Sequence, residues 1–272
     1  MNIPFVKMHT SGNDFVIIDN RSNNYKFKQT QISELSHRNT GIGFDQLIFL
    51  EKSKNKDILM KIFNSDGKEA QMCGNAAICV ASLLFSSKKT NSVSIETIST
   101  DINANLNKDG KISITIKLPS QIFSEVLSNN NVNVNNLDFS KIHASLNSGI
   151  LVNMGNPHIV FIVKDLEDVD LPKYGSKIEK NRLFSDGINM EIVEIVNNNK
   201  LKVKFWERGS GLTLSCGSGI LSAFYACYKN NFCEKEAEMV IPLGKVSTSI
   251  KDSKLTMSAK PQVSYIGEFS YE

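Results

Sequence analysis

The chain has 272 residues, 41% of them hydrophobic and 22% charged, and a net charge of +3. This composition is typical of a globular protein with one large domain or two ordinary ones, and the small, dispersed charge argues against a nucleic-acid partner. No apolar run reaches the roughly 18 residues that span a bilayer, and no signal-peptide pattern is present, so we expect a cytoplasmic protein without a membrane partner.

The predicted elements of the first half are mostly short strands. Gly12-Asn13 precedes a strand-like run, and Cys73-Gly74 precedes an apolar helix. β-rich runs separated by turn residues predict strands, whereas apolar positions in helical spacing predict helices. In chain order, we expect a strand over 15–19, a helix over 30–39, a strand over 57–63, a helix over 76–85 and strands over 93–99 and 111–118.

The second half repeats this pattern. An Asn- and Ser-rich run over 121–147 suggests a crossover between two lobes. Gly155-Asn156 then precedes a strand-like run, and Cys216-Gly217 precedes another apolar helix. We expect strands over 159–163, 190–196 and 200–206, a helix over 220–228 and a strand over 254–260.

An internal repeat underlies this similarity. The separation between Cys73-Gly74 and Cys216-Gly217 is shared, without a gap, by three further polar or Gly-containing pairs. Repeated motifs at one common separation, the repeat offset, indicate a duplicated structural unit. The other pairs are Gly12-Asn13 with Gly155-Asn156, Gln46 with Asn189, and Asn64 with Glu207.

The position of the two Cys-Gly pairs suggests chemistry. The first turn of a helix has free backbone N–H groups and a partial positive charge, which stabilise a thiolate and bind a carboxylate. We therefore expect lowered thiol pKa values at Cys73 and Cys216. Two such thiols facing one carbon could invert an amino acid, one removing the Cα proton and the other returning one.

The remaining cysteines and the histidines do not suggest a metal site. Cys79, Cys227 and Cys233 lack the flanking glycine, so we interpret them as core or incidental thiols. The five cysteines form no CxxC pair, and the four histidines lack ligand spacing. We therefore expect no metal.

At these residues the sequence resembles the diaminopimelate epimerase family. The similar segments are KMHTSGNDFVIID (7–19), GIGFDQLIFL (41–50), FNSDGKEAQMCGNAAIC (63–79), NMGNPHIV (153–160) and WERGSGLTLSCGSG (206–219). The resemblance implies interconversion of LL- and meso-diaminopimelate, without a cofactor, on the route to lysine and peptidoglycan. It also implies a homodimer.

The fold implied is α+β, with two pseudo-symmetric β-barrel-like lobes, each around a central helix, and an active site in the cleft between them. We expect the N-terminal lobe to comprise residues 1–120 together with 263–272, and the C-terminal lobe to comprise 121–262.

The resemblance also assigns roles to individual residues. Cys73 and Cys216 are the catalytic pair, and His158 and Glu207 tune the thiol pKa values. Glu207 can also pair with the substrate ammonium, and Arg208 with its distal carboxylate. The full expected substrate-binding set is Asn13, Gln46, Asn64, Gly74, Asn75, Asn156, Asn189, Glu207, Arg208, Gly217 and Ser218.

Departures from the family pattern leave other functions open. Thr10 replaces a common Gly, Ile78 a common Arg and Leu212 a frequent Glu. A racemase or epimerase of another amino acid, such as a proline or hydroxyproline type, is the nearest alternative, although those relatives typically have His in place of Asn75. A non-catalytic amino-acid-binding relative is a second alternative. A nucleotide-binding enzyme is disfavoured because 209–219 lacks the Lys-Ser/Thr ending of a P-loop.

Overall fold

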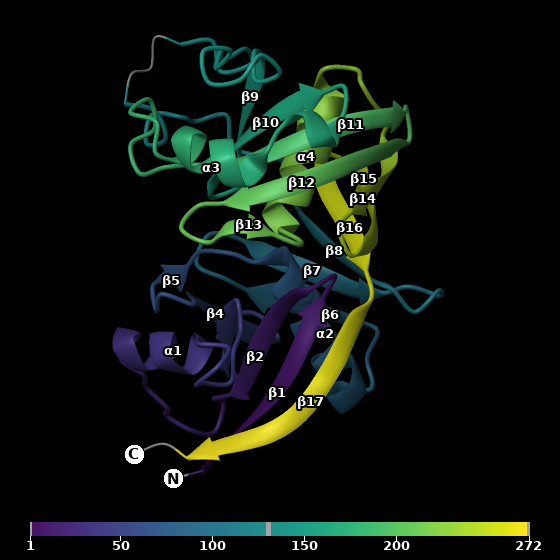
Figure 1. Ribbon diagram of the computed structural model, residues 1–272. Helices are drawn as coiled ribbons and strands as arrows, with labels where there is room; N and C mark the ends of the chain where they lie inside the picture. Colours follow the sequence, from purple (N-terminus) through teal and green to yellow (C-terminus); the bar gives the residue numbers. More distant parts are fainter. Residues whose placement is uncertain (1, 129–131, 271–272) are drawn as a thin grey trace. The chain divides into compact units, whose positions relative to one another are not determined.

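The computed structural model describes residues 2–128 and 132–270 and separates into two compact units. Unit 1 comprises Met1–Ile116 and Ser258–Glu272, and unit 2 comprises Lys117–Met257. Each unit consists of β-strands packed with a small number of helices (Figure 1). Residues 129–131 of the expected crossover and 271–272 of the expected C-terminal segment lie outside the described residues.

Unit 1 is a mixed sheet with α2 against it. The strand order follows from the pairings β17–β1–β2–β3–β4–β6–β7–β8, in which β2–β3 and β4–β6 are parallel and the other pairs antiparallel, and β5 adds to β4. Its elements are β1 (Asn2–Thr10), β2 (Asn13–Asp19), α1 (Gln29–Ser36), β3 (Gln46–Glu51), β4 (Ile58–Asn64), β5 (Glu69–Ala70), α2 (Gly74–Lys88), β6 (Ser92–Glu96), β7 (Asp101–Leu106), β8 (Ile112–Lys117) and β17 (Pro261–Ser270).

Unit 2 has the same plan. Its pairings run β9–β10–β11–β12–β14–β15, with β10–β11 and β12–β14 parallel, and β13 adds to β12. Its elements are β9 (Gly149–Asn153), β10 (Pro157–Val163), the 3-10 turn η1 (Leu166–Asp168), α3 (Leu171–Glu179), β11 (Asn189–Asn197), β12 (Lys200–Glu207), β13 (Gly211–Thr213), α4 (Gly217–Lys229), β14 (Glu236–Ile241), β15 (Gly244–Lys251) and β16 (Lys254–Ala259).

The strand register repeats with the sequence. Phe15 faces Gln46 in the β2–β3 pair, and His158 faces Asn189 in the β10–β11 pair, so both partners are displaced by the repeat offset. The next antiparallel pairs, β3–β4 and β11–β12, keep the same offset. The duplication inferred from four short motifs is therefore a duplication of the strand pairing itself.

Each unit buries one helix whose sequence is apolar on every side. In α2 the residues from Gly74 to Ala81 are all buried, and in α4 the residues from Gly217 to Cys227 are all buried. A helix that is hydrophobic all round must be enclosed rather than laid on a surface. The α2 helix contacts β1, β2, β6, β7 and β17, and α4 contacts β9, β10, β11, β12 and β14. The predicted central helices are confirmed.

The α+β class and the plan of two barrel-like lobes, each with a central helix, are also confirmed; the sheets do not close into complete barrels. The strand pairings among the described residues form open sheets. An open sheet that curves around a central helix can bury that helix without closing.

The short helix α3 was not expected from the sequence. Its N-cap is Asp170, whose carboxylate accepts from the Lys173 N–H, and Pro172 occupies the first turn, where no N–H donor is needed. Gly175 brings the helix onto the indole of Trp206, since a Cβ there would lie 2.2 Å from Cδ2 of that ring. Pro and Gly within this short segment concealed a helix that tertiary packing stabilises.

The Asn- and Ser-rich run over 121–147 contributes to the core of unit 2. Val126, Leu127, Leu137, Phe139 and Leu146 are buried with the side chains of β10 and β11. The described part of this run thus packs within one unit. Among the described residues, no helix is long and apolar enough to cross a membrane.

Candidate active site

Both Cys-Gly motifs lie at helix starts. Cys73 is the N-cap of α2, where its Sγ accepts from the Ala76 N–H at 3.5 Å. Cys216 is the N-cap of α4, where its Sγ accepts from the Gly219 N–H at 3.4 Å. Both side chains are nearly buried, at 8% and 5% exposure. Each sulfur therefore takes the place that an N-cap oxygen normally occupies.

In unit 1, Cys73 belongs to a cluster of amide side chains. The side-chain oxygen of Asn13, Oδ1, accepts from Nδ2 of Asn75 at 3.2 Å, and Sγ of Cys73 lies 3.9 Å from the same oxygen. Asn13 begins β2 directly after Gly12, whose φ of +89° is in the region that favours glycine. The structure therefore brings together three of the expected site residues, Asn13, Cys73 and Asn75.

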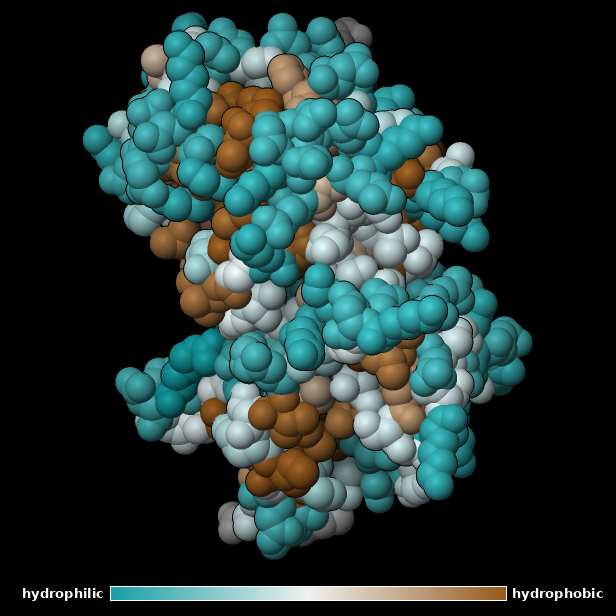
Figure 2. All heavy atoms as spheres, turned by 90° about the vertical axis from the view of Figure 1, so that its right-hand side faces the viewer, coloured by the Kyte–Doolittle hydropathy of each residue, from teal (hydrophilic) through white to brown (hydrophobic). Residues whose placement is uncertain are grey.

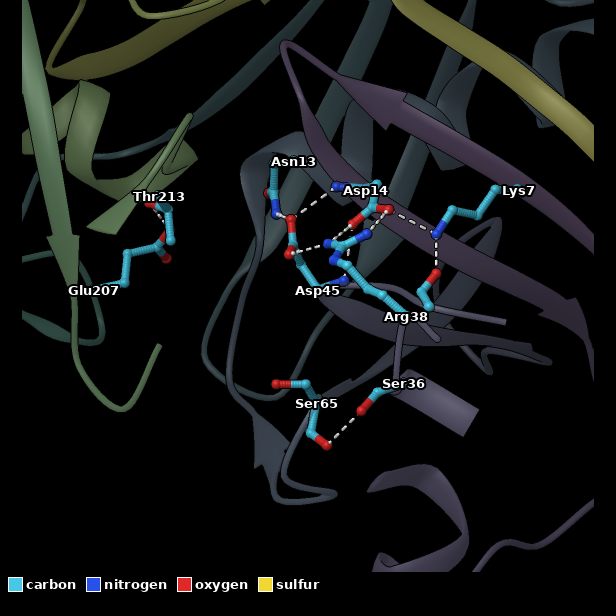
Figure 3. Close-up of polar contacts among 10 residues, drawn as sticks. Lys7, Asn13, Asp14, Ser36, Arg38, Asp45, Ser65, Glu207 and Thr213 are labelled. Atoms are coloured by element: carbon cyan, nitrogen blue, oxygen red, sulfur yellow. Dashed lines mark hydrogen bonds and ion pairs between the residues drawn. The ribbon is translucent and has the colours of Figure 1, made fainter. Parts of the chain in front are cut away.

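A charged network fixes the orientation of the Asn13 amide (Figure 3). Nδ2 of Asn13 donates to Oδ2 of Asp45 at 2.9 Å. Because a carboxylate only accepts, the amide nitrogen must face Asp45 and its oxygen must face Cys73. Asp14 and Asp45 each accept the backbone N–H of the other, at 2.9 and 3.0 Å. Arg38 contacts both carboxylates at 2.9 Å, and the Lys7 ammonium reaches Asp14 at 2.7 Å.

The two carboxylates of this network differ in acidity. Burial alone would raise the pKa of Asp14, but hydrogen bonds from Arg38 and Lys7 outweigh it and lower the pKa to about 2. Burial and the neighbouring Asp14 charge raise the pKa of Asp45, against the hydrogen bond from Asn13. Asp14 is therefore the firmly ionised member that anchors the two cations.

Gln46 and Asn64 form a second pair in unit 1. They face each other in the β3–β4 register, and Nε2 of Gln46 donates to Oδ1 of Asn64 at 3.0 Å. Oε1 of Gln46 is buried and has no hydrogen-bond partner among the described residues. A buried carbonyl oxygen without a partner is suited to accept from a bound ligand.

In unit 2, Cys216 is linked to Asn156 through Ser218. The Ser218 hydroxyl lies 3.5 Å from Sγ of Cys216 and accepts from Nδ2 of Asn156 at 3.2 Å. Ser218 has the place in α4 that Asn75 has in α2, and Asn156 repeats Asn13. In unit 1 the Asn13 amide contacts the thiol directly, whereas in unit 2 the Asn156 amide contacts it through the Ser218 hydroxyl. Gly74 and Gly217 are the first residues of the two helices.

The loop after β12 carries the charged part of the expected site. Oδ1 of Asn189 accepts from the backbone N–H of Arg208 at 2.9 Å, and Nδ2 of Asn189 donates to the Pro157 carbonyl at 2.9 Å. The Arg208 guanidinium donates to the carbonyl and carboxylate of Asp186 at 2.8 and 2.9 Å. Oε1 of Glu207 accepts from the Thr213 hydroxyl at 2.5 Å (Figure 3).

The buried partner of His158 is Glu191. Nδ1 of His158 lies 2.8 Å from Oε1 of Glu191, and both side chains are completely buried. Sequence reasoning associated His158 with Glu207 as a tuning pair. In the structure the hydrogen bond from the ring goes to a residue that the sequence did not single out.

The predicted thiol acidity is wrong for Cys216. Burial raises its pKa well above the ordinary value, and the charges of Glu207 and Glu191 raise it further. The Ser218 hydroxyl and the Gly219 N–H act in the opposite direction but do not compensate. The helix-start argument omitted the loss of water and the two acidic neighbours, so Cys216 is a protonated thiol at neutral pH in this structure.

Several residues that organise the site were missed by sequence reasoning. Asp45 and Asp14 lie inside the quoted motifs beside Asn13 and Gln46, and that adjacency was an available signal. Glu179 gave no such signal. Its carboxylate accepts from Trp206 Nε1 at 2.7 Å and from the Gly209 N–H at 3.0 Å, which fixes both sides of the Glu207-Arg208 pair.

A metal site has no support in the described part of the chain, where no group of three or more His, Cys, Asp or Glu side chains could hold an ion. The donors at each helix start are uncharged polar groups: a thiol with two amides beside Cys73, and a thiol with a hydroxyl and an amide beside Cys216.

The fold is shared with solved structures of proteins that are named as a hydroxyproline epimerase, a probable proline racemase and a methylitaconate isomerase. A probable proline racemase from Agrobacterium radiobacter matches with a TM-score of 0.69 and 12% identity, over 99% of this chain and 93% of that one. A phenazine biosynthesis protein of the PhzF family from Bacillus anthracis matches with a TM-score of 0.69 and 15% identity over all of both chains.

Sequence comparison narrows the class to one family. The family model described as diaminopimelate epimerase matches residues 5–119 and 150–267. Diaminopimelate epimerase of Pelagibacter ubique is 35% identical over 269 residues, covering 98% of this chain and 97% of the relative. That of Rickettsia africae is 34% identical, covering 99% and 98%. The chain belongs to the diaminopimelate epimerase family and is an isomerase.

Proposed function

We propose that the chain interconverts LL- and meso-2,6-diaminopimelate by proton transfer at Cα, with Cys73 and Cys216 acting on opposite faces of the carbon and without a cofactor. The observation that carries this proposal is that both thiols cap the first turn of a buried helix in a repeated unit. Family membership and the names of the relatives support the substrate.

The chemistry requires stabilisation of the carbanion. A helix start offers free N–H groups to the substrate carboxylate, which becomes enediolate-like as the Cα proton leaves. A thiolate on one face takes this proton, and a thiol on the other face delivers one. Because Cys216 is protonated in this structure, it enters as the acid for the stereoisomer whose Cα–H faces Cys73. For the other stereoisomer, Cys216 must first lose its proton.

The remaining residues bind the substrate in this scheme. The helix starts receive the reacting carboxylate, Glu207 the ammonium and Arg208 the distal carboxylate. Arg208 already holds the Asp186 carboxylate, which is 95% exposed and can leave when a substrate carboxylate replaces it. His158 and Glu207 tune the thiols. The binding set is Asn13, Gln46, Asn64, Gly74, Asn75, Asn156, Asn189, Glu207, Arg208, Gly217 and Ser218.

The proposal is tested by exchange of the Cα proton in D₂O. Reduced protein is incubated with LL-diaminopimelate, and deuterium at Cα is followed by NMR together with formation of the meso isomer. L-Lysine is the matched control, because it has a similar chain but lacks the distal carboxylate. We expect exchange and inversion of diaminopimelate only. Exchange of proline in its place would support the proline-type alternative, and no exchange of any amino acid would favour a binding protein.

The biological setting follows from this reaction. The product supplies lysine and peptidoglycan synthesis, and we place the enzyme in the cytoplasm, where reduced thiols persist. We also propose that it acts as a homodimer.

The strand β17 offers an apolar surface for such a dimer. Val263, Tyr265 and Ile266 are 53%, 46% and 75% exposed, and hydrophobic side chains gather on the part of Figure 2 where unit 1 lies. A patch of this kind usually marks an interface. We expect sedimentation equilibrium to give a dimer, and Ile266→Lys to shift it toward the monomer. A monomeric parent protein, or an unchanged dimer in the variant, would contradict this assignment.

A further inference from the structure

A fully buried acid–imidazole pair lies inside unit 2. His158 on β10 and Glu191 on β11 are both 0% exposed, and Nδ1 of the ring lies 2.8 Å from Oε1 of the acid. The other polar atoms, His158 Nε2 and Glu191 Oε2, are also buried and have no hydrogen-bond partner among the described residues. Burying such atoms without partners is costly, so the pair requires an explanation beyond packing.

Unit 1 shows that the fold does not need this pair. At the repeat offset, His158 and Glu191 correspond to Phe15 and Ile48, which are also 0% exposed and have the same strand register. An apolar pair therefore fills the same place in the sister unit. Since a buried polar or charged pair is commonly no more stabilising than an apolar one, stability does not account for the polar pair in unit 2.

The acid lies against the helix turn that carries Cys216. A Cβ at Gly219 would be only 2.5 Å from Oε1 of Glu191, so the carboxylate needs the space that glycine leaves. In unit 1 the residue that corresponds to Gly219 is Ala76, and the residue that corresponds to Glu191 is the apolar Ile48. Gly219 is also the residue whose N–H donates to Sγ of Cys216. Glu191 thus approaches the backbone that holds the thiol.

We propose that Glu191 is a positioning residue for the reaction: it holds the His158 ring through Nδ1, keeps Nε2 available as a proton acceptor, and sets a buried negative charge beside Cys216. Because a carboxylate accepts, Nδ1 of the ring donates to Glu191, and in a neutral imidazole the lone pair is then on Nε2. The consequences for turnover rest on the proposed epimerase function, whereas the effect on the thiol does not.

The charges that act on Cys216 come from two neighbouring strands. Glu191 on β11 and Glu207 on β12 are the acids, His158 on β10 contacts Glu191, and Ser218 is the polar neighbour on α4 itself. β9 has no titratable side chain, and β14 turns Ala237, Met239 and Ile241 inward. Burial and the charges of Glu207 and Glu191 raise the pKa of Cys216, so removal of one charge should lower it.

Three variants separate orientation from charge. Glu191→Gln retains an oxygen that can accept from Nδ1 and removes only the charge. Glu191→Ile introduces the residue type found at the corresponding position of unit 1, and it removes both the charge and the acceptor oxygen. The double variant His158→Phe with Glu191→Ile reproduces the apolar pair of unit 1, so it tests the proposal if an unpaired His158 prevents folding. Glu194→Gln is the control, because Glu194 is on the same strand and pairs with Lys202 at 2.6 Å.

The first readout is the rate of Cys216 alkylation by iodoacetamide against pH, followed by peptide mass spectrometry. We expect Glu191→Gln to lower the apparent pKa of Cys216 by about one unit, a shift of the size that a nearby buried charge produces. Glu194→Gln should leave it unchanged. An unchanged Cys216 profile in Glu191→Gln would overturn the role of the charge.

The second readout is turnover of diaminopimelate. We expect kcat to fall roughly 10- to 100-fold in Glu191→Ile and in the double variant, as for loss of other orienting partners, with KM little changed. Glu191→Gln should recover most of kcat because it still orients the ring. Parent-like kcat in the double variant would overturn the orienting role. If the parent protein has no epimerase activity, the proposed function fails, but the alkylation result still decides the effect of Glu191.

Discussion

Replacing Cys73 with Ala is expected to lower epimerisation by about a thousandfold or more, and replacing Cys216 with Ala is expected to do the same. A positioned acid or base contributes roughly 10²- to 10⁴-fold, and inversion needs both groups. The measurement is kcat in both directions, with LL-diaminopimelate as the substrate in one and meso-diaminopimelate in the other. Full activity in either variant would contradict the two-base scheme.

Cys79→Ala provides the matched control for this loss. Cys79 is on the same helix as Cys73 and is buried, and burial raises its pKa to about 12. Its thiol contacts the Thr10 hydroxyl at 3.2 Å and does not cap the helix. We expect its replacement to change kcat by less than about threefold, since a buried neutral thiol acts as a small apolar side chain. An equal loss in all three variants would point to general disruption of the fold.

Much of the fold was predictable because periodicity and repetition are properties of the sequence. The apolar helices after Cys73 and Cys216 follow from their unbroken hydrophobic runs, and the shared offset of the motifs predicted a repeat that extends to strand register. Whether the sheets close into barrels was not predictable, since closure depends on twist and on where the edge strands end. The helix α3 was hidden because Pro172 and Gly175 lower helix propensity, whereas packing on Trp206 decides the outcome.

The predictability of the site divides in the same way. Cys73 and Asn75 follow from a local motif, and the structure brings them to Asn13. Glu191 could not be selected, because a Glu within a β-rich run is usually exposed, and only the fold shows that it is buried against His158. The raised pKa of Cys216 has a similar origin. The helix start was visible in the sequence, but the burial and the acids on other strands were not.

Replacing Asp14 with Ala is expected to destabilise the protein by about 3 kcal/mol, because it leaves a buried cation without its partner. The Lys7 side chain is 7% exposed and its ammonium lies 2.7 Å from Asp14. Its other contact is the Gly43 carbonyl. Arg38 loses one carboxylate but retains Asp45 and is largely exposed. Urea unfolding followed by circular dichroism measures the change.

A double variant distinguishes the stranded charge from the lost contacts. Lys7→Met with Asp14→Ala removes both charges, so we expect it to recover at least half of the lost stability. A double variant as unstable as Asp14→Ala alone would contradict the argument.

The pH dependence gives an independent check, since the pKa of Asp14 is lowered to about 2 in the folded protein. Its stabilising contribution is complete above the unfolded pKa of about 3.9 and is lost as the pH falls toward 2. The raised pKa of Asp45 acts in the opposite direction, so the parent protein should lose less stability on acidification than Asp14 alone predicts. The Asp14→Ala variant lacks the Asp14 contribution, so it should lose less stability on acidification than the parent.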